Sequence, residues 1–118
     1  MADAGTTSIT DEDAKLVTLA RSSRARTGAA EGAAVRDETG RTYSGTTVNL
    51  QALRLSALQS AVAAAVASGA KGIEGAAIVT GVDTVQAPDL AVASELAVAD
   101  AHLHRCSPAG DVIESVAL

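Results

Sequence analysis

The stretch LRLSALQSAVAAAVASGAKGIEGAAIVT, residues 53–80, decides the fold. Its first part, residues 53–68, is apolar on almost every side, which predicts a buried helix. Gly69 follows at the position after a helix end that favours glycine. Residues 73–80 then form a continuous run of small apolar residues, which is typical of a central strand.

The flanking sequence predicts the other elements. Thr10 followed by acidic residues indicates a helix over about 11–26, and β-prone runs at 32–36 and 41–48 indicate a hairpin. Pro88 suits the first position of a short helix that runs to about residue 99, and strands are expected at 102–106 and 112–118. Strands joined by a helix should be parallel neighbours with right-handed crossovers. The prediction is therefore an α/β fold of three layers, with helices packed on a mixed five-stranded sheet.

Length and composition point to one small domain. The chain has 118 residues, and we expect a single domain over residues 10–118 after a disordered segment at 1–9. Alanine dominates its apolar residues, and it has no Phe, no Trp and one Tyr, so the core is weak for the length. A weak core and a central helix without a polar face both predict a homo-oligomer, either a dimer or a tetramer.

The net charge of −5 argues against nucleic-acid binding, because nucleic-acid-binding proteins usually carry a basic face. The basic cluster of Arg21, Arg24 and Arg26 falls late in the first predicted helix, where positive charge suits the helix dipole; phosphate binding is the less favoured alternative. A single cysteine, no secretory signal pattern and no uninterrupted apolar span predict a cytoplasmic protein that does not enter a membrane.

Short motifs recur along the chain in a particular order: EGAA at 31–34, ETGRTYSG at 38–45, AVASG at 65–69 and AGDV at 109–112. In this order and spacing they resemble motifs of the small cytidine deaminase family, over about residues 11–118. The resemblance implies the cytidine-deaminase-like fold and a tetramer assembled around the central helix.

Members of that family carry C-A-E or H-A-E at the start of the central helix and P-C-x-x-C at the start of the next. Three of these residues hold zinc, which generates hydroxide, and the glutamate moves protons. By resemblance, the ligand positions here hold Ser56, Asp89 and Val92, and the glutamate position holds Leu58. Serine and valine are poor zinc ligands and leucine carries no proton, so we expect no zinc, no cofactor and no deaminase activity.

Structural roles account for the replacements. Ser56 with Gln59 fits a capping box, and Asp89 suits the first turn of a helix. Leu58 and Val92 can fill the former site with hydrocarbon. The leading hypothesis is therefore an inactive cytidine-deaminase-like protein that acts as a structural or protein-interaction module, with an unidentified protein partner.

Two alternatives stay open. The family's ribose-binding N-x-E pair aligns with Thr47 and Asn49, which can still hydrogen-bond, so weak nucleoside binding is one alternative even though Tyr43 is the only aromatic residue. His102, His104 and Cys106 alternate along a predicted strand and should share one face. Such a face could hold zinc or copper in a hydrolase with relocated metal chemistry; otherwise the histidines lie at a surface or interface and Cys106 is a small buried side chain.

Overall fold

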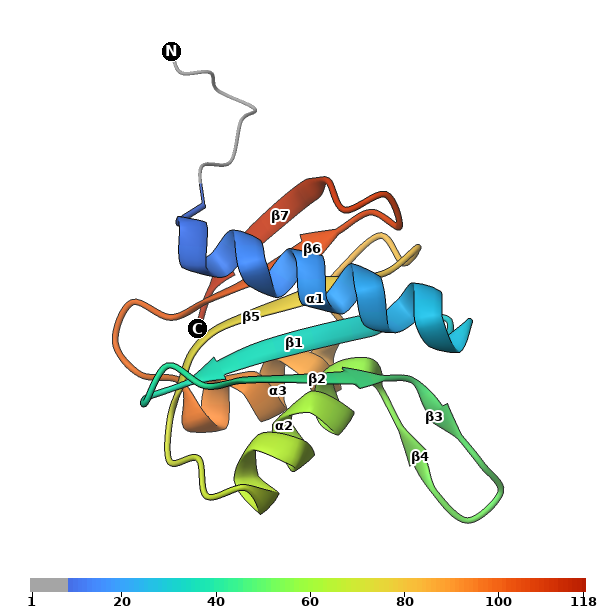
Figure 1. The fold of residues 1–118 in the computed structure, drawn as a ribbon, viewed down its shortest axis with the longest axis horizontal. Coiled ribbons are helices and arrows are strands. Elements are labelled where there is room, and N and C mark those ends of the chain that lie inside the picture. Colours follow the sequence, from blue (N-terminus) through green and yellow to red (C-terminus); the bar gives the residue numbers. More distant parts are fainter. Residues whose placement is uncertain (1–8) are drawn as a thin grey trace.

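The computed structural model describes residues 9–118 (Figure 1). The expected disorder of residues 1–9 therefore falls, apart from Ile9, outside the described residues. The elements are α1 (Asp11–Thr27), β1 (Gly32–Asp37), β2 (Thr42–Thr46), β3 (Val48–Asn49), β4 (Arg54–Leu55), α2 (Ala57–Ala67), β5 (Ile73–Val79), α3 (Ala87–Leu96), β6 (His102–Cys106) and β7 (Val112–Ala117).

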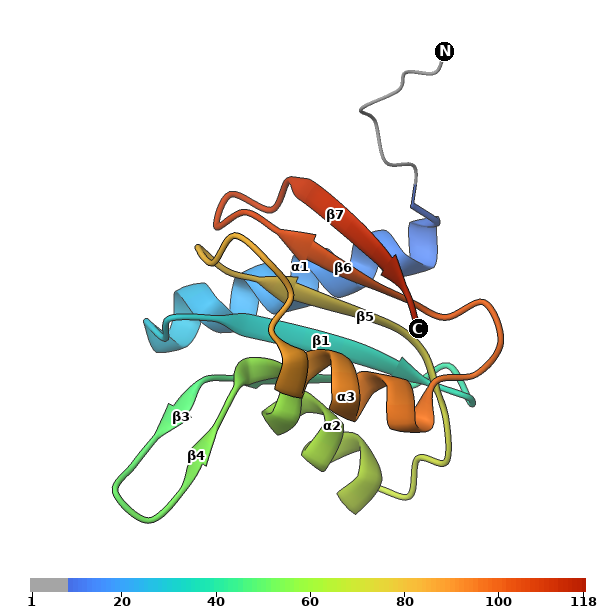
Figure 2. The same cartoon turned by 180° about the vertical axis from the view of Figure 1, so that it is seen from behind.

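The main sheet has five strands in the order β2-β1-β5-β6-β7, and the predicted three-layer α/β fold is confirmed. Figure 1 shows α1 on one face of the sheet, and Figure 2 shows α2 and α3 on the opposite face. Each layer of helices buries its own apolar cluster against the sheet. Leu58, Ile73 and Leu103 lie in the cluster under α2 and α3, whereas Leu16, Val79 and Cys106 lie in the cluster under α1.

The prediction that strands joined by a helix are parallel neighbours is confirmed for β5 and β6, which α3 connects, and is wrong for β2 and β5, which α2 connects. The other pairs of the main sheet, β1–β2, β1–β5 and β6–β7, are antiparallel. The connection through α2 carries the chain from β2 past β1 to β5, so its two strands run in the same direction without touching. The sequence shows that a helix joins two strands, but it does not show that a third strand lies between them.

The central helix is shorter than predicted. It begins at Ala57 rather than at residue 53, and Arg54 and Leu55 instead pair with β3 in a small hairpin that projects from the body of the protein (Figures 1 and 2). The capping box at Ser56 fixes the start of α2, so the apolar residues before it stay outside the helix. The second predicted strand likewise ends at Thr46, where the chain turns into this hairpin.

The boundaries of α3 also differ slightly from the prediction. It begins at Ala87, so Pro88 is its second residue rather than its first, and it ends at Leu96 rather than at residue 99. Ala97 adopts an extended conformation and forms a bridge with Ile73, which ends the helix. Within residues 9–118, the helices are too short or too polar for any of them to pass through a lipid bilayer.

Gly45 lets α2 approach β2 closely. A Cβ atom at Gly45 would lie 2.5 Å from the backbone nitrogen of Ala61 and 2.9 Å from the carbonyl oxygen of Ala57. No side chain fits in that space, so the helix rests directly on the backbone of the strand. This contact helps to set the position of the N-terminal half of α2, where the candidate site begins.

Candidate functional site

The N-termini of α2 and α3 meet beneath the sheet (Figure 2). The Ser56 hydroxyl donates a hydrogen bond to Asp89 Oδ1 over 2.5 Å, although the two residues are 33 positions apart in sequence. Ser56 Oγ also accepts from the backbone nitrogen of Gln59, and Gln59 Oε1 accepts from the backbone nitrogen of Ser56. The capping box is thus present, and its serine is also the residue that ties the two helices together.

Asp89 is a buried carboxyl group, with 3% of its surface exposed. Burial raises the pKa of Asp89, because it disfavours the charged form, and the hydrogen bond from Ser56 acts in the opposite direction. Asp89 lies in the first turn of α3, as the sequence predicted. The carboxyl group therefore links two helices in addition to suiting the dipole of one.

Hydrocarbon fills the rest of this region. Leu58 is 1% exposed and belongs to the apolar cluster under α2 and α3. Val92 is partly buried and packs against the same cluster. The four positions that the sequence resemblance implied therefore lie on the facing helices α2 and α3 or, for Ser56, at the N-cap of α2. The structure joins Ser56 to Asp89 and places Leu58 and Val92 in or against the core.

These residues do not fit a zinc ion. Structural and catalytic zinc sites take thiolate, imidazole or carboxylate donors. Among Ser56, Asp89 and Val92 only Asp89 is such a donor, and its Oδ1 already accepts from the serine hydroxyl. Across residues 9–118, no three His, Cys, Asp or Glu residues group in a way that could hold a metal ion. No step of a reaction can therefore be assigned to zinc at this position.

Thr47 and Asn49 do not share a pocket. Thr47 Oγ1 accepts a hydrogen bond from the backbone nitrogen of Glu31, and Thr47 lines a hollow of about 440 Å³ together with Glu31 and Thr80. Asn49 is exposed on β3 in the projecting hairpin and does not line this hollow. The Tyr43 ring packs against the apolar cluster under α2 and α3, and its hydroxyl donates to Asp37 Oδ2 over 2.9 Å. These contacts give Tyr43 a structural role.

The strand with two histidines lies as predicted but does not fit a metal either. The rings of His102 and His104 stack with their centroids 6.3 Å apart, so they share a face. Both ring nitrogens of His104 lie within hydrogen-bonding distance of partners, Asp13 and Ser115. Cys106 is fully buried, and burial raises its thiol pKa to about 11, so it is a small buried side chain rather than a thiolate ligand.

Sequence reasoning missed the partners of His104. In the sequence, Asp13 is one of three acidic residues that follow Thr10 at a helix start, and no motif marks Ser115. The distance between Asp13 and His104 in the sequence is 91 residues, so no local pattern connects them. The only available signal was an acidic residue one turn before Leu16, on the face of the helix that packs on the sheet.

The family model for cytidine deaminase-like proteins matches residues 9–110. No curated protein matches the chain. The solved structure of cytidine deaminase from Burkholderia pseudomallei is similar, with a TM-score of 0.75 and 20% identity over 92% of this chain and 93% of that chain. Cytidine deaminase from Mycobacterium leprae gives a TM-score of 0.67 with 19% identity, over 89% and 95% of the two chains.

Cytidine deaminase from Mycobacterium tuberculosis is also similar, with a TM-score of 0.67 and 23% identity over 80% of this chain and 85% of that chain. At such identities the structural likeness establishes the fold alone. The family model spans most of the sequence, from Ile9 to Gly110. On these grounds the chain belongs to the cytidine deaminase-like family.

Proposed function

We propose that this protein has lost deaminase activity and acts as a structural or protein-interaction module. The observation that carries the proposal is the Ser56–Asp89 hydrogen bond at the ligand positions, next to a fully packed Leu58 at the glutamate position. A group that moves protons must carry a titratable proton, and leucine has none. A protein of this kind acts through contacts made by its surface. The single cysteine favours a cytoplasmic location.

The chemistry of the family depends on two contributions that these residues cannot make. Zinc lowers the pKa of bound water to about 7 and so supplies hydroxide at neutral pH. General acid–base catalysis contributes roughly 10²–10⁴-fold in rate. Ser56, Leu58, Asp89 and Val92 supply neither a zinc site nor a glutamate that can transfer protons. Restoring the zinc site alone or the glutamate alone should therefore leave the rate of deamination at background.

We expect the purified, untagged protein to hold far less than one zinc per chain after mild chelation, and to release no ammonia from cytidine or deoxycytidine above background. The reason is that Val92 and Ser56 offer no anionic or imidazole donor. Elemental analysis and an ammonia-release assay test this. Near one zinc per chain, or turnover that disappears in Asp89→Ala, would overturn the proposal.

A second copy of the chain is the proposed partner at one surface. Large apolar side chains are exposed on the β3–β4 hairpin and on α2, namely Leu50 (59%), Leu53 (49%) and Val66 (51%). Both elements lie on the side of the sheet away from α1 (Figures 1 and 2). Exposed apolar surface of this kind is typical of interfaces, and closed two-fold symmetry is the common arrangement for copies of one chain.

We expect light scattering at micromolar concentration to give the mass of a dimer or of a tetramer of the 11.7 kDa chain. The double variant Leu53→Asp/Val66→Asp should shift the mass toward one chain, because charge at an apolar interface is costly to bury. Ile113→Asp is the matched control, since Ile113 is equally exposed but lies on β7. A mass of 11.7 kDa at every concentration would rule out self-association.

Nucleoside binding has less support, because Thr47 is engaged with Glu31 and Asn49 does not line the same hollow. An interaction with an unidentified protein is the broader proposal, and a pull-down from the native cell tests it. The Leu53→Asp/Val66→Asp variant is the control there as well, since a partner that uses the apolar surface should no longer be captured.

A further inference from the structure

A chain of hydrogen bonds connects three elements on the face of the sheet covered by α1. His104 Nε2 lies 2.8 Å from Asp13 Oδ2, and His104 Nδ1 lies 2.7 Å from Ser115 Oγ. Asp13 comes from α1, His104 from β6 and Ser115 from β7, directly opposite His104 in the strand register. A serine hydroxyl, an imidazole and a carboxylate thus form a continuous hydrogen-bonded chain.

The chemistry of Asp13 and Ser115 determines which nitrogen of the neutral His104 ring carries the proton. A carboxylate accepts hydrogen bonds only, so the neutral imidazole carries its proton on Nε2 and donates it to Asp13. Nδ1 is then unprotonated and accepts from the Ser115 hydroxyl. This is the tautomer that a general base needs in order to take a proton from a serine.

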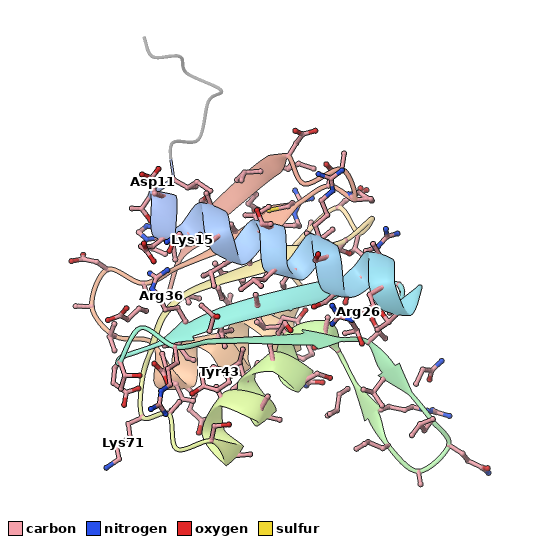
Figure 3. The ribbon with its side chains drawn as sticks, in the orientation of Figure 1. Asp11, Lys15, Arg26, Arg36, Tyr43 and Lys71 are labelled. Atoms are coloured by element: carbon pink, nitrogen blue, oxygen red, sulfur yellow. The ribbon has the colours of Figure 1, made fainter. Side chains whose placement is uncertain are left out.

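An ion pair with Arg36 helps to position Asp13. Arg36 Nη2 lies 2.9 Å from Asp13 Oδ1, and Arg36 Nε donates to Glu74 Oε1 over 3.1 Å. Figure 3 shows Arg36 beside the first turns of α1. A Cβ atom at Gly75 would lie 2.7 Å from Asp13 Oδ1, so the absence of a side chain there gives the carboxylate its room. Asp13 therefore fixes both the tautomer and the orientation of the ring.

The same residues border a hollow that a reactant can enter. Its volume is about 480 Å³, and Asp13, His104 and Ser115 all line it, with Thr10 and His102 beside them. Ser115 is partly exposed, whereas His104 is buried. The hydroxyl is thus reachable from the hollow, and the imidazole that serves as its base lies directly behind it.

We propose that Ser115 is a nucleophile that accepts the acyl group of small carboxylic esters, with His104 as its general base and Asp13 as the positioning residue. This site lies on the opposite face of the sheet from Ser56 and Asp89. The proposal for Ser115 is therefore independent of the proposal that deaminase activity has been lost. Similar activated-nucleophile arrangements are defined by the roles of their residues, not by their order in a sequence.

The reaction runs in two steps. Ser115 Oγ bonds to the ester carbonyl carbon as its proton passes to His104 Nδ1, and the alcohol leaves with that proton when its C–O bond breaks. Water then attacks the acyl-serine carbonyl and gives a proton to Nδ1. The proton returns to Ser115 Oγ as the carboxylic acid departs, so the overall change is the hydrolysis of one ester by one water.

The test uses the full chain with two probes, p-nitrophenyl acetate and an alkyl fluorophosphonate. We expect release of p-nitrophenol above the rate in buffer and a single phosphonyl adduct on Ser115, located by peptide mass mapping. Ser115→Ala should abolish both signals. Ser107→Ala is the matched control, because Ser107 is also partly exposed but its hydroxyl accepts from the backbone of Asp111, so both signals should persist.

His104→Gln keeps a hydrogen-bond donor for Asp13 but has no base, and it should slow labelling of Ser115 by roughly 100-fold or more. Asp13→Asn should lower kcat more than it changes KM, a split that a purely structural role would not produce. The melting temperature of each variant separates loss of fold from loss of chemistry. The absence of a Ser115 adduct in the folded wild-type protein at saturating fluorophosphonate, or equal labelling in folded His104→Gln, would overturn the proposal.

Discussion

Leu58→Glu is expected to destabilise the protein by about 3–6 kcal/mol and to lower its melting temperature by more than about 10 °C. Leu58 is 1% exposed in the apolar cluster under α2 and α3. The variant loses the burial of a leucine side chain and places a carboxylate among hydrocarbon. Because native proteins are stable by only about 5–15 kcal/mol, this loss removes a large part of the free energy of unfolding. Thermal and urea denaturation followed by circular dichroism measure the effect.

The control for this variant is Ala91→Glu, which adds the same charge at an exposed position of α3. We expect it to change stability by less than about 0.5 kcal/mol. Restoring the family's glutamate should not restore deamination in Leu58→Glu, since Ser56, Asp89 and Val92 remain. An unchanged melting temperature would mean that Leu58 does not lie in a closed site and that the packing described for it is wrong.

Gly45→Ala should have the second large effect, a loss of about 3 kcal/mol or more in the free energy of unfolding. The new methyl group would meet the backbone nitrogen of Ala61 at 2.5 Å and the backbone oxygen of Ala57 at 2.9 Å. These atoms belong to the body of α2, so the whole helix must shift away from β2 to make room. Urea denaturation gives the change in free energy.

Gly81→Ala is the matched control, because a Cβ atom there meets nothing within 4 Å. It should be neutral or slightly stabilising, since alanine restricts the unfolded chain more than glycine does. Similar stability of the two variants would show that α2 has freedom to move and does not rest rigidly on the strand. That result would also weaken the description of the Ser56–Asp89 link as a fixed contact between helices.

Local signals predicted most of the elements. Thr10 and the acids after it placed the start of α1, and its side chain does accept from the backbone nitrogen of Asp13. The residues from Ser56 to Gln59 predicted a capping box that is present. The residues before Ser56 misled the prediction, because Leu53 and Leu55 continue the apolar pattern of the helix although they belong to a hairpin. Composition alone does not distinguish these two arrangements.

The candidate sites were less accessible to sequence reasoning. The resemblance to a known family led us to expect Ser56 and Asp89 at positions of one site, but the hydrogen bond between them depends on how the two helices pack. The partners of His104 depend on three elements meeting, and Asp13 is the most distant of them in sequence. Such contacts leave no periodic pattern along the chain, so only the three-dimensional structure reveals them.

The strand order has a consequence for synthesis on the ribosome. β1 needs β5 on its second edge, and β5 ends only at Val79, 42 residues after β1 ends at Asp37. At a translation rate of about 5–20 residues per second, the second edge of β1 remains unpaired for roughly 2–8 seconds. An unpaired edge can recruit another nascent chain, and a charged side chain on the strand discourages such pairing. Arg36, on β1, is thus suited to protect the chain before it finds Asp13 and Glu74 in the finished protein.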